Sequence, residues 1–281
     1  MDSVKKKPTM KRTAFFISDG TGITAEALGQ SLLAQFTDVQ FDKVTLPYVD
    51  TIEKAKEAAA KINHARIHDN GNPLIFDTII NKDVRAELKK CGGFMTDVFG
   101  AFLEPLEQEL GEKSSYAVGG MHTISRQSSC LKRIEAMNFA IDNDDGARIR
   151  QYPEADIILV GVSRSGKTPA SIYLALQYGI KAANFPLTED DFEDQRLPAS
   201  IRQYKSRIFG LTIDPERLHF IRSERAPNSR YSSAKQCRYE IEEVELIYKR
   251  ERIPFINSTD YSIEEISTRL LMMTGLEKHY L

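Results

Sequence analysis

Short apolar stretches alternate along this chain with longer segments in which apolar residues recur every three or four positions, and glycine or proline often separates the two. The apolar stretches predict buried strands, and the longer segments predict amphipathic helices. Regular alternation of strand and helix is typical of α/β domains with parallel sheets. We therefore expect an α/β protein made of two alternating strand-helix halves, each with a parallel sheet.

The first half opens with the apolar stretch from Thr13 to Ser18, followed by a glycine-rich turn and a segment of helical period from Ala25 to Phe36. Later apolar stretches predict further strands, and the charged segments between them predict helices. We expect these strands at 44–49 and 73–80, and these helices at 51–68, 81–91 and 94–110.

Residues 111–128 contain many turn formers and no sustained period, so we interpret them as a connection, and helical period returns from Cys130 to Ile141. The second half then alternates again. Its strands are expected at 156–160, 181–187, 207–213 and 253–257, with helices that follow Thr168, Pro215, Asn228 and Ser262. This predicts a basic tail at 1–12, an N-terminal α/β domain at 13–112, a linker with a helix at 113–150 and a C-terminal domain at 151–281.

Composition places the chain among ordinary globular proteins. Its 281 residues are 41% hydrophobic and 28% charged, with a net charge of −2, which argues against a general nucleic-acid binder. No segment is apolar enough over sufficient length to predict a membrane span, and the basic start is not followed by a signal-peptide core. The three cysteines are far apart, which indicates neither a disulfide framework nor a zinc site. We expect a cytoplasmic protein without nucleic-acid or membrane partners.

The most specific chemical signal runs from Gly161 to Thr168 and fits the phosphate-binding pattern G-x-x-x-x-G-K-[ST]. In such loops backbone N–H groups surround phosphate oxygens, a lysine supplies charge, and the last hydroxyl reaches Mg²⁺. An ordinary glycine turn is the alternative, but a buried strand before the loop and Pro169 in the first helical turn after it favour a phosphate site. We therefore predict a P-loop, kinase-like second domain with Lys167 at a solvent-facing position and Thr168 on the metal. The residues expected to bind the nucleotide are Gly161, Val162, Ser163, Arg164, Ser165, Gly166, Lys167 and Thr168.

Three further positions have both a chemical and a structural interpretation. Asp144, in the turn Asp144–Gly146, is a candidate base or metal ligand, although the turn could simply end a helix. His122 lies among glycines as a candidate proton carrier, although lone histidines are more often structural. Asp19 could line a ligand crevice at the end of a parallel strand, or could belong to a simple strand-to-helix turn.

Other charged residues remain open between two roles. Asp214 ends an apolar strand as a metal-holding carboxylate does, but we favour a helix cap because Pro215 follows it. The acidic loop at 189–194 is expected to be exposed, with partner docking as the alternative. A phosphate clamp and a solvated basic face are equally compatible with three nearby arginines, Arg222, Arg225 and Arg230.

Several motifs together resemble one known family. They are Ile17–Glu26, Asp144–Gly146, the loop with Pro169, Phe209–Leu218 and Asn257–Glu265, and they resemble the phosphoenolpyruvate synthase regulatory proteins, relatives of the pyruvate, phosphate dikinase regulators. The resemblance runs from about residue 13 to the end and is most specific over 228–265. It is weakest around 121–126, apart from Gly120 and His122.

The resemblance implies a bifunctional kinase and pyrophosphorylase. Such an enzyme uses ADP to phosphorylate and inactivate a threonine of phosphoenolpyruvate synthase, and uses inorganic phosphate to remove that phosphate as pyrophosphate. We therefore expect ADP, inorganic phosphate and Mg²⁺ as cofactors, with Lys167, Asp144 and His122 as candidate catalytic residues.

Two other functions remain as alternatives. One is a small-molecule P-loop kinase of the nucleoside-monophosphate type, and the other is a non-enzymatic nucleotide switch. Against a guanine-nucleotide switch, Asn81-Lys-Asp-Val84 misses the N-K-x-D motif by one position. The sequence does not decide between a monomer and a homo-oligomer.

Overall fold

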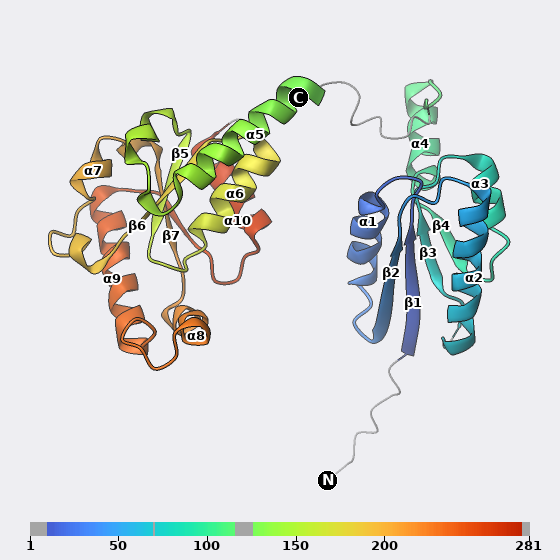
Figure 1. Cartoon of the computed structure of the whole chain (residues 1–281), viewed down its shortest axis with the longest axis horizontal. Helices are drawn as coiled ribbons and strands as arrows, with labels where there is room; N and C mark the ends of the chain where they lie inside the picture. The colour runs from blue at the N-terminus through green and yellow to red at the C-terminus, as the bar shows by residue number, and fades with distance from the viewer. Residues whose placement is uncertain (1–9, 70, 116–125, 277–281) are drawn as a thin grey trace, which may run out of the picture. The chain divides into compact units, whose positions relative to one another are not determined.

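The computed structural model of the chain describes residues 10–69, 71–115 and 126–276, with the side chains of Met10 and of 126–130 left out. It divides into two compact units, Met1–Thr123 and Ile124–Leu281 (Figure 1). The helix after the connecting segment, expected in the linker, packs against the second unit.

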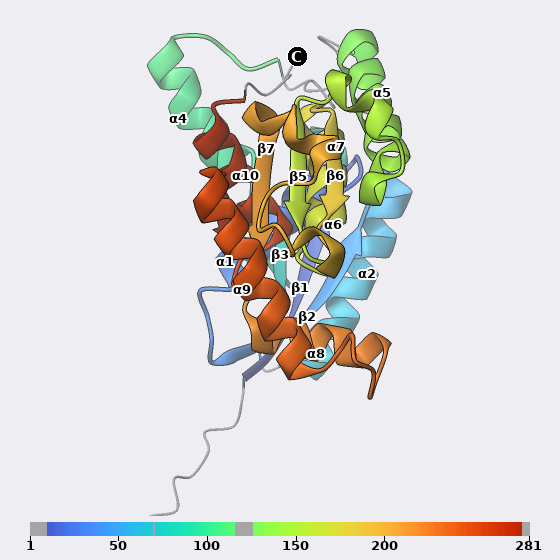
Figure 2. The same ribbon diagram turned by 90° about the vertical axis from the view of Figure 1, so that its left-hand side faces the viewer.

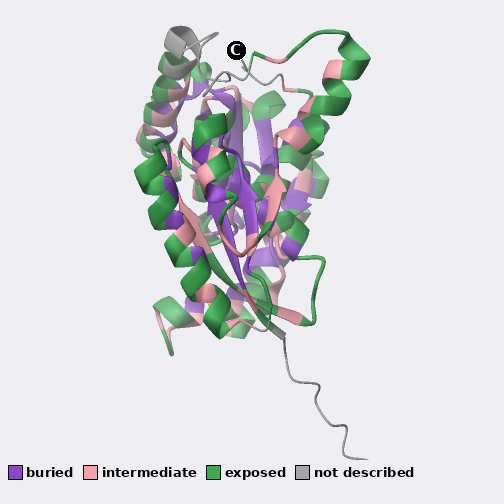
Figure 3. Cartoon of the chain, turned by 90° about the vertical axis from the view of Figure 1, so that its right-hand side faces the viewer, coloured by how far each residue is buried: buried purple, intermediate pink, exposed green. Residues whose placement is uncertain are grey.

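The N-terminal unit contains a four-stranded parallel sheet in the order β2-β1-β3-β4. The strands are β1 (Met10–Ile17), β2 (Val39–Leu46), β3 (Leu74–Asp77) and β4 (Phe94–Asp97). The helices are α1 (Ile23–Leu33), α2 (Ile52–His68), α3 (Lys82–Leu88) and α4 (Gly100–Leu110). One face of the sheet is covered by α2 and α3 and the other by α1, so buried strands lie between helices whose outer faces are exposed (Figure 3).

The C-terminal unit repeats this plan with the strand order β6-β5-β7-β8, again parallel, and Figure 2 shows β5 between β7 and β6. Its strands are β5 (Ile157–Gly161), β6 (Ala182–Pro186), β7 (Ile208–Thr212) and β8 (Phe255–Asn257). Its α-helices are α5 (Arg126–Asp142), α6 (Lys167–Tyr178), α7 (Ala199–Arg202), α8 (Pro215–Arg225), α9 (Ala234–Glu251) and α10 (Ile263–Thr274). Its 3-10 turns are η2 (Asp144–Gly146), η3 (Ile149–Glu154), η4 (Glu189–Asp191) and η5 (Lys205–Arg207).

Alternate residues of β5 build the two cores of this unit. Ile157 and Leu159 point to the layer formed by α6 and α10, whereas Ile158 and Val160 point to the layer that contains α9. All five residues of β5 are buried, as expected for the central part of a parallel sheet covered on both faces. The predicted α/β architecture with two parallel sheets is therefore confirmed.

Several element bounds differ from the expectation: β2, expected at 44–49, spans Val39–Leu46, β3, expected at 73–80, spans only Leu74–Asp77, and the largest differences lie at 94–110 and at the start of α9. The segment at 94–110 was expected to be one helix, but Phe94–Asp97 is a strand that pairs with β3, and α4 begins only at Gly100. The apolar residues of this short strand also fit a helical period, and pairing with a distant strand decided between the two. Similarly, α9 begins at Ala234 rather than near Asn228, because Ser233 caps it by accepting a hydrogen bond from the N–H of Gln236.

The ends of the chain add two observations. Residues 10–12, expected in the basic tail, belong to β1 because they pair with 39–41 of β2, and residues 1–9 lie outside the described part. Among the described residues, no helix combines the length and the apolar composition needed to cross a bilayer.

Close packing of α1 on its sheet depends on a glycine. An alanine Cβ at Gly29 would lie 2.8 Å from Cδ1 of Phe16 and 3.0 Å from Cδ2 of Phe76. We predict that Gly29→Ala pushes α1 away from the sheet and lowers the free energy of unfolding of the N-terminal unit by about 1–3 kcal/mol. Urea denaturation measures this change.

Gly20→Ala is the matched control, because its Cβ would make only an ordinary contact, 3.7 Å from Oγ of Ser18. An unchanged urea midpoint for Gly29→Ala would show that α1 is not held against Phe16 as described.

Candidate active site

The glycine loop joins the end of β5 to the start of α6, as the motif predicted. Gly161 lies so close to the neighbouring strand that an added Cβ would be 2.5 Å from the carbonyl oxygen of Leu211. Gly166 has φ of +95°, a value that L side chains rarely adopt, and an added Cβ there would meet no protein atom within 4 Å. The first glycine is therefore required by packing, and the second by backbone conformation.

The lysine of the loop is buried rather than solvent-facing, contrary to the sequence-based expectation. Lys167 is only 3% exposed, and its Nζ donates a hydrogen bond to the carbonyl oxygen of Val162 at 3.0 Å. Burial lowers the pKa of the ammonium to about 8, and the nearby carboxylates of Asp145 and Asp144 oppose this shift. Lys167 thus places a poorly solvated positive charge inside the loop.

An acidic turn lies directly beside the loop. Oδ1 of Asp144 accepts hydrogen bonds from Oγ1 of Thr168 at 2.8 Å and from Nδ2 of Asn184 at 2.5 Å. The amide oxygen of Asn184 in turn accepts from the N–H of Asp145 at 2.9 Å. Three segments far apart in sequence, η2, β6 and the start of α6, therefore meet at one point, with the carboxylate of Asp145 exposed.

The donor set next to the loop fits Mg²⁺ bound together with a nucleotide. The Thr168 hydroxyl and the Asp144 carboxylate are hard oxygen ligands that already touch each other. Among the described residues, no group of three or more His, Cys, Asp and Glu side chains could hold a metal alone. A magnesium ion held by Thr168 and Asp144 would take its remaining ligands from phosphate oxygens and water.

The three arginines considered as a phosphate clamp have different environments. Arg222 is 1% exposed, and its terminal nitrogens donate to both carboxylate oxygens of Glu240 at 3.1 and 2.7 Å. Arg230 is exposed and pairs with Glu189, whereas Arg225 is exposed near the end of α8. They do not form a common clamp in this conformation.

Other candidates are placed as follows. Asp214 is the N-cap of α8, with Oδ1 accepting from the N–H groups of Glu216 and Arg217, as favoured from the sequence. The acidic loop at 189–194 is mostly exposed, as expected. Its first carboxylate, that of Glu189, accepts hydrogen bonds from Arg230 and Gln236. His122 and Gly120 lie outside the described residues.

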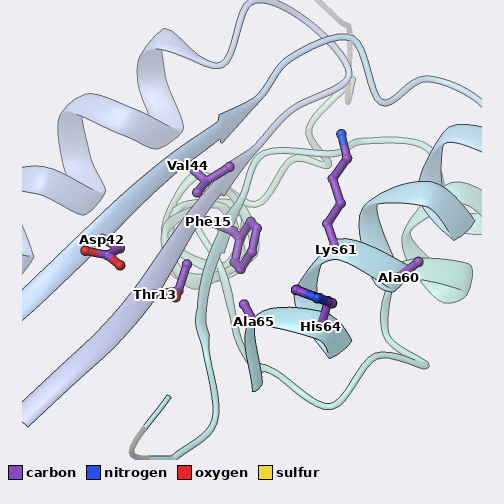
Figure 4. Close-up of a pocket in the computed structure, with 8 residues that line it drawn as sticks. All are labelled: Thr13, Phe15, Asp42, Val44, Ala60, Lys61, His64 and Ala65. Atoms are coloured by element: carbon purple, nitrogen blue, oxygen red, sulfur yellow. The ribbon is translucent and has the colours of Figure 1, made fainter. Parts of the chain in front are cut away.

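The N-terminal unit presents two features outside this site. The carboxylate of Asp19 accepts from the N–H of Ile80 at 2.8 Å, so it ties together the segments that follow β1 and β3. A shallow hollow of about 590 Å³ lies between α2 and the edge strand β2 (Figure 4). Its lining residues are Thr13, Phe15, Asp42, Val44, Ala60, Lys61, His64 and Ala65. This hollow has largely apolar walls and no glycine loop, so the loop at 161–168 remains the candidate active site.

The sequence did not indicate several residues that complete the site. Asn184 was simply one position of an expected strand, yet it is fully buried and bridges Asp144 and Asp145. Ser258 follows β8, and its Oγ lies 3.0 Å from the carbonyl oxygens of both Ser165 and Thr212. A polar residue inside an apolar strand was the available signal for Asn184, but no local pattern indicated Ser258.

Known proteins are similar to this chain over almost its whole length. A family model described as kinase/pyrophosphorylase matches residues 14–271. The chain is 70% identical over 270 residues to a protein of Hahella chejuensis, covering 96% of this chain and 99% of the relative. It is 62% identical over 270 residues to a protein of Marinobacter nauticus, with 96% and 100% covered. Both relatives have names that assign them provisionally to the regulation of phosphoenolpyruvate synthase. The chain belongs to the kinase/pyrophosphorylase family.

Proposed function

We propose that this protein is a bifunctional regulator of phosphoenolpyruvate synthase in the cytoplasm. It transfers the terminal phosphoryl group of ADP to a threonine of that enzyme, and it removes the group again with inorganic phosphate. The observation that carries the proposal is the buried Lys167 ammonium inside a complete phosphate loop, with Asp144 against Thr168. The family match and the names of the relatives support the choice of reaction and target.

In the forward reaction, the threonine hydroxyl oxygen attacks the terminal phosphorus of ADP, and the bond from that phosphorus to the bridging oxygen breaks. The products are phosphothreonine, AMP and one proton. Phosphoryl transfer depends mainly on positioning and charge stabilisation, which the loop N–H groups and Lys167 supply. The exposed Asp145 carboxylate, next to the engaged Asp144, is suited to accept the proton. Mg²⁺ held by Thr168 and Asp144 would neutralise phosphate charge.

In the reverse reaction, an oxygen of inorganic phosphate attacks the phosphorus of phosphothreonine, and the bond to the threonine oxygen breaks. The threonine oxygen regains a proton, and the other product is pyrophosphate. In this scheme inorganic phosphate occupies the position that the AMP moiety's phosphate has in the forward reaction. The same loop can therefore serve both directions.

The proposal is tested with purified phosphoenolpyruvate synthase and ADP. We expect AMP to form in proportion to the phosphate found on one threonine, which phosphopeptide mapping locates. When the phosphorylated target is then incubated with inorganic phosphate in place of ADP, we expect release of pyrophosphate. Phosphorylation of a small acceptor without the protein target would instead support a nucleoside-monophosphate-type kinase. Nucleotide binding without transfer to any acceptor would support a switch.

The first prediction from the proposed function concerns the charge of Lys167. Lys167→Met keeps most of the side-chain volume but removes the ammonium, so we expect phosphoryl transfer to fall at least about 100-fold while the fold persists. Initial rates and circular dichroism measure the two effects. Lys249→Met, at a 63% exposed side chain on α9, is the control and should keep full activity. Unchanged transfer by a folded Lys167→Met protein would contradict the assignment.

The second prediction concerns the conformation of Gly166. In Gly166→Ala a residue with a Cβ would have to adopt φ near +95°, which costs about 1–3 kcal/mol of conformational strain. The loop should therefore shift away from its phosphate-binding shape. We expect threonine phosphorylation and pyrophosphate release to fall together, as measured with radiolabelled target and chromatography.

Gly275→Ala provides the matched control for this experiment, because Gly275 has φ of +69° and equally open surroundings but ends α10. It should lower stability without affecting either reaction. Loss of kinase activity with full pyrophosphate release in Gly166→Ala would require two separate sites.

The third prediction concerns pH. The pKa of Lys167 is lowered to about 8 by burial, and a bound phosphate would raise it again. Below pH 8 the ammonium is already charged, so this group adds no pH dependence. Above pH 8 binding must take up a proton, and the affinity for ADP should fall by up to about tenfold per pH unit. Titration calorimetry between pH 7 and 9.5 measures this, with Lys167→Met as the control that removes the decline.

A further inference from the structure

A polar cluster with two buried members, Arg222 and Glu240, and two partly buried ones, Ser163 and Tyr231, joins the phosphate loop to the segment between α8 and α9. We call it the Ser163 clamp and define it as Ser163, Arg222, Tyr231 and Glu240. Arg222 donates from Nη2 to the carbonyl oxygen of Ser163 and from Nη1 to that of Tyr231, each at 3.1 Å. The hydroxyl groups of Ser163 and Tyr231 lie 3.0 Å apart. Ser163 is therefore held at its carbonyl group and at its side chain by two different residues.

The clamp is rigid because its charges are buried and matched. Arg222 is 1% exposed and binds Glu240 through two parallel hydrogen bonds, which fix the guanidinium plane. The guanidinium carbon also lies 4.2 Å from the centre of the Tyr231 ring. Gln236 also donates to Oε1 of Glu240 at 3.0 Å and helps to orient the carboxylate. With both terminal nitrogens engaged, Arg222 acts on the loop rather than on a ligand.

The residue after Ser163 has an unfavourable backbone. Arg164 has φ of +74°, in the left-handed region that residues with a Cβ rarely occupy. Such a conformation persists only where the surrounding structure imposes it. On the N-terminal side of Arg164, Ser163 is fixed by the clamp. On the C-terminal side of Arg164, the carbonyl oxygen of Ser165 accepts a hydrogen bond from the hydroxyl of Ser258. Between these two anchors the N–H of Ser165 donates to the carbonyl oxygen of Val162 at 3.3 Å, and the N–H of Arg164 is expected to meet phosphate.

We propose that Arg222 and Tyr231 are positioning residues that hold Ser163 and thereby keep Arg164 in the left-handed conformation, so that the phosphate loop is formed before the nucleotide arrives. This inference rests on the proposed function for the identity of the ligand, but its effect on the loop is independent of any ligand. The inference also assigns a role to the segment 226–233 between α8 and α9. Its Tyr231 contacts the phosphate loop through the hydroxyl of Ser163.

Tyr231→Phe is the most selective test, because it removes the hydroxyl and retains the ring against Arg222. We expect hydrogen exchange of the Ser165 amide, which donates to the carbonyl oxygen of Val162 within the loop, to accelerate about fivefold in the free protein. The KM for ADP should rise about five- to tenfold, the effect of one lost hydrogen bond, while kcat changes less than about twofold. Tyr239→Phe, at an exposed tyrosine on α9, is the matched control and should change neither quantity.

A second set of variants tests the coupling. Ser163→Ala removes the partner hydroxyl, so it should accelerate exchange of the Ser165 amide, and the double variant with Tyr231→Phe should add little further. Arg222→Gln should accelerate this exchange more strongly, and Arg222→Lys should restore only part of the protection because an ammonium lacks the planar, two-pronged geometry.

The outcomes separate this inference from the proposed function. Unchanged exchange of the Ser165 amide and unchanged KM in Tyr231→Phe would overturn the positioning role, and so would a lower melting temperature with normal exchange of this amide. If Tyr231→Phe accelerates exchange but the wild-type protein does not bind ADP, the clamp is upheld and the proposed ligand is overturned.

Discussion

The site is organised around a positive charge that the protein buries without fully neutralising it. Lys167 donates to the carbonyl oxygen of Val162, and the carboxylates of Asp144 and Asp145 oppose the effect of burial on its pKa, which nevertheless remains lowered. Burying an ammonium is costly unless anions and hydrogen bonds compensate. Phosphate oxygens at the loop would complete this compensation. Under the proposed function, the cost of burying this charge in the free protein is offset when phosphate binds.

The surrounding structure fixes the loop by its carbonyl groups. The hydroxyl of Tyr248 lies within hydrogen-bond distance of the carbonyl oxygens of Val160 in β5 and Leu211 in β7. The N–H of Leu187 donates to the carbonyl oxygen of Gly161. Lys167, Arg222 and Ser258 donate to the carbonyl oxygens of Val162, Ser163 and Ser165. Hydrogen bonds to these carbonyl oxygens fix the peptide planes of the loop, as an anion-binding loop would require. Residues from α8, α9 and the segment after β8 thus determine a geometry that the glycine motif alone only permits.

Local sequence patterns predicted those parts of the fold that depend on local chemistry. The helix after the glycine loop, and the reciprocal capping of α10 by Ser262 and Glu265, form as their residues indicate. The strand at Phe94–Asp97 was missed because its pairing partner is twenty residues away, and its apolar residues also fit a helix. The burial of Lys167 and the bridging by Asn184 depend on packing between distant segments, which no spacing along the chain expresses.

A comparison of the two units separates what the backbone supplies from what the side chains add. Both units pass from a central parallel strand through a glycine-containing turn into a helix, and both turns end in a left-handed glycine, Gly22 with φ of 83° and Gly166 with φ of 95°. This similarity shows that the strand-to-helix turn is a general solution of the parallel sheet. The second turn alone among the described residues carries a lysine after that glycine and an acidic turn beside it. Because phosphoryl transfer requires charge placed against developing charge, the chemistry follows these additions rather than the shared backbone.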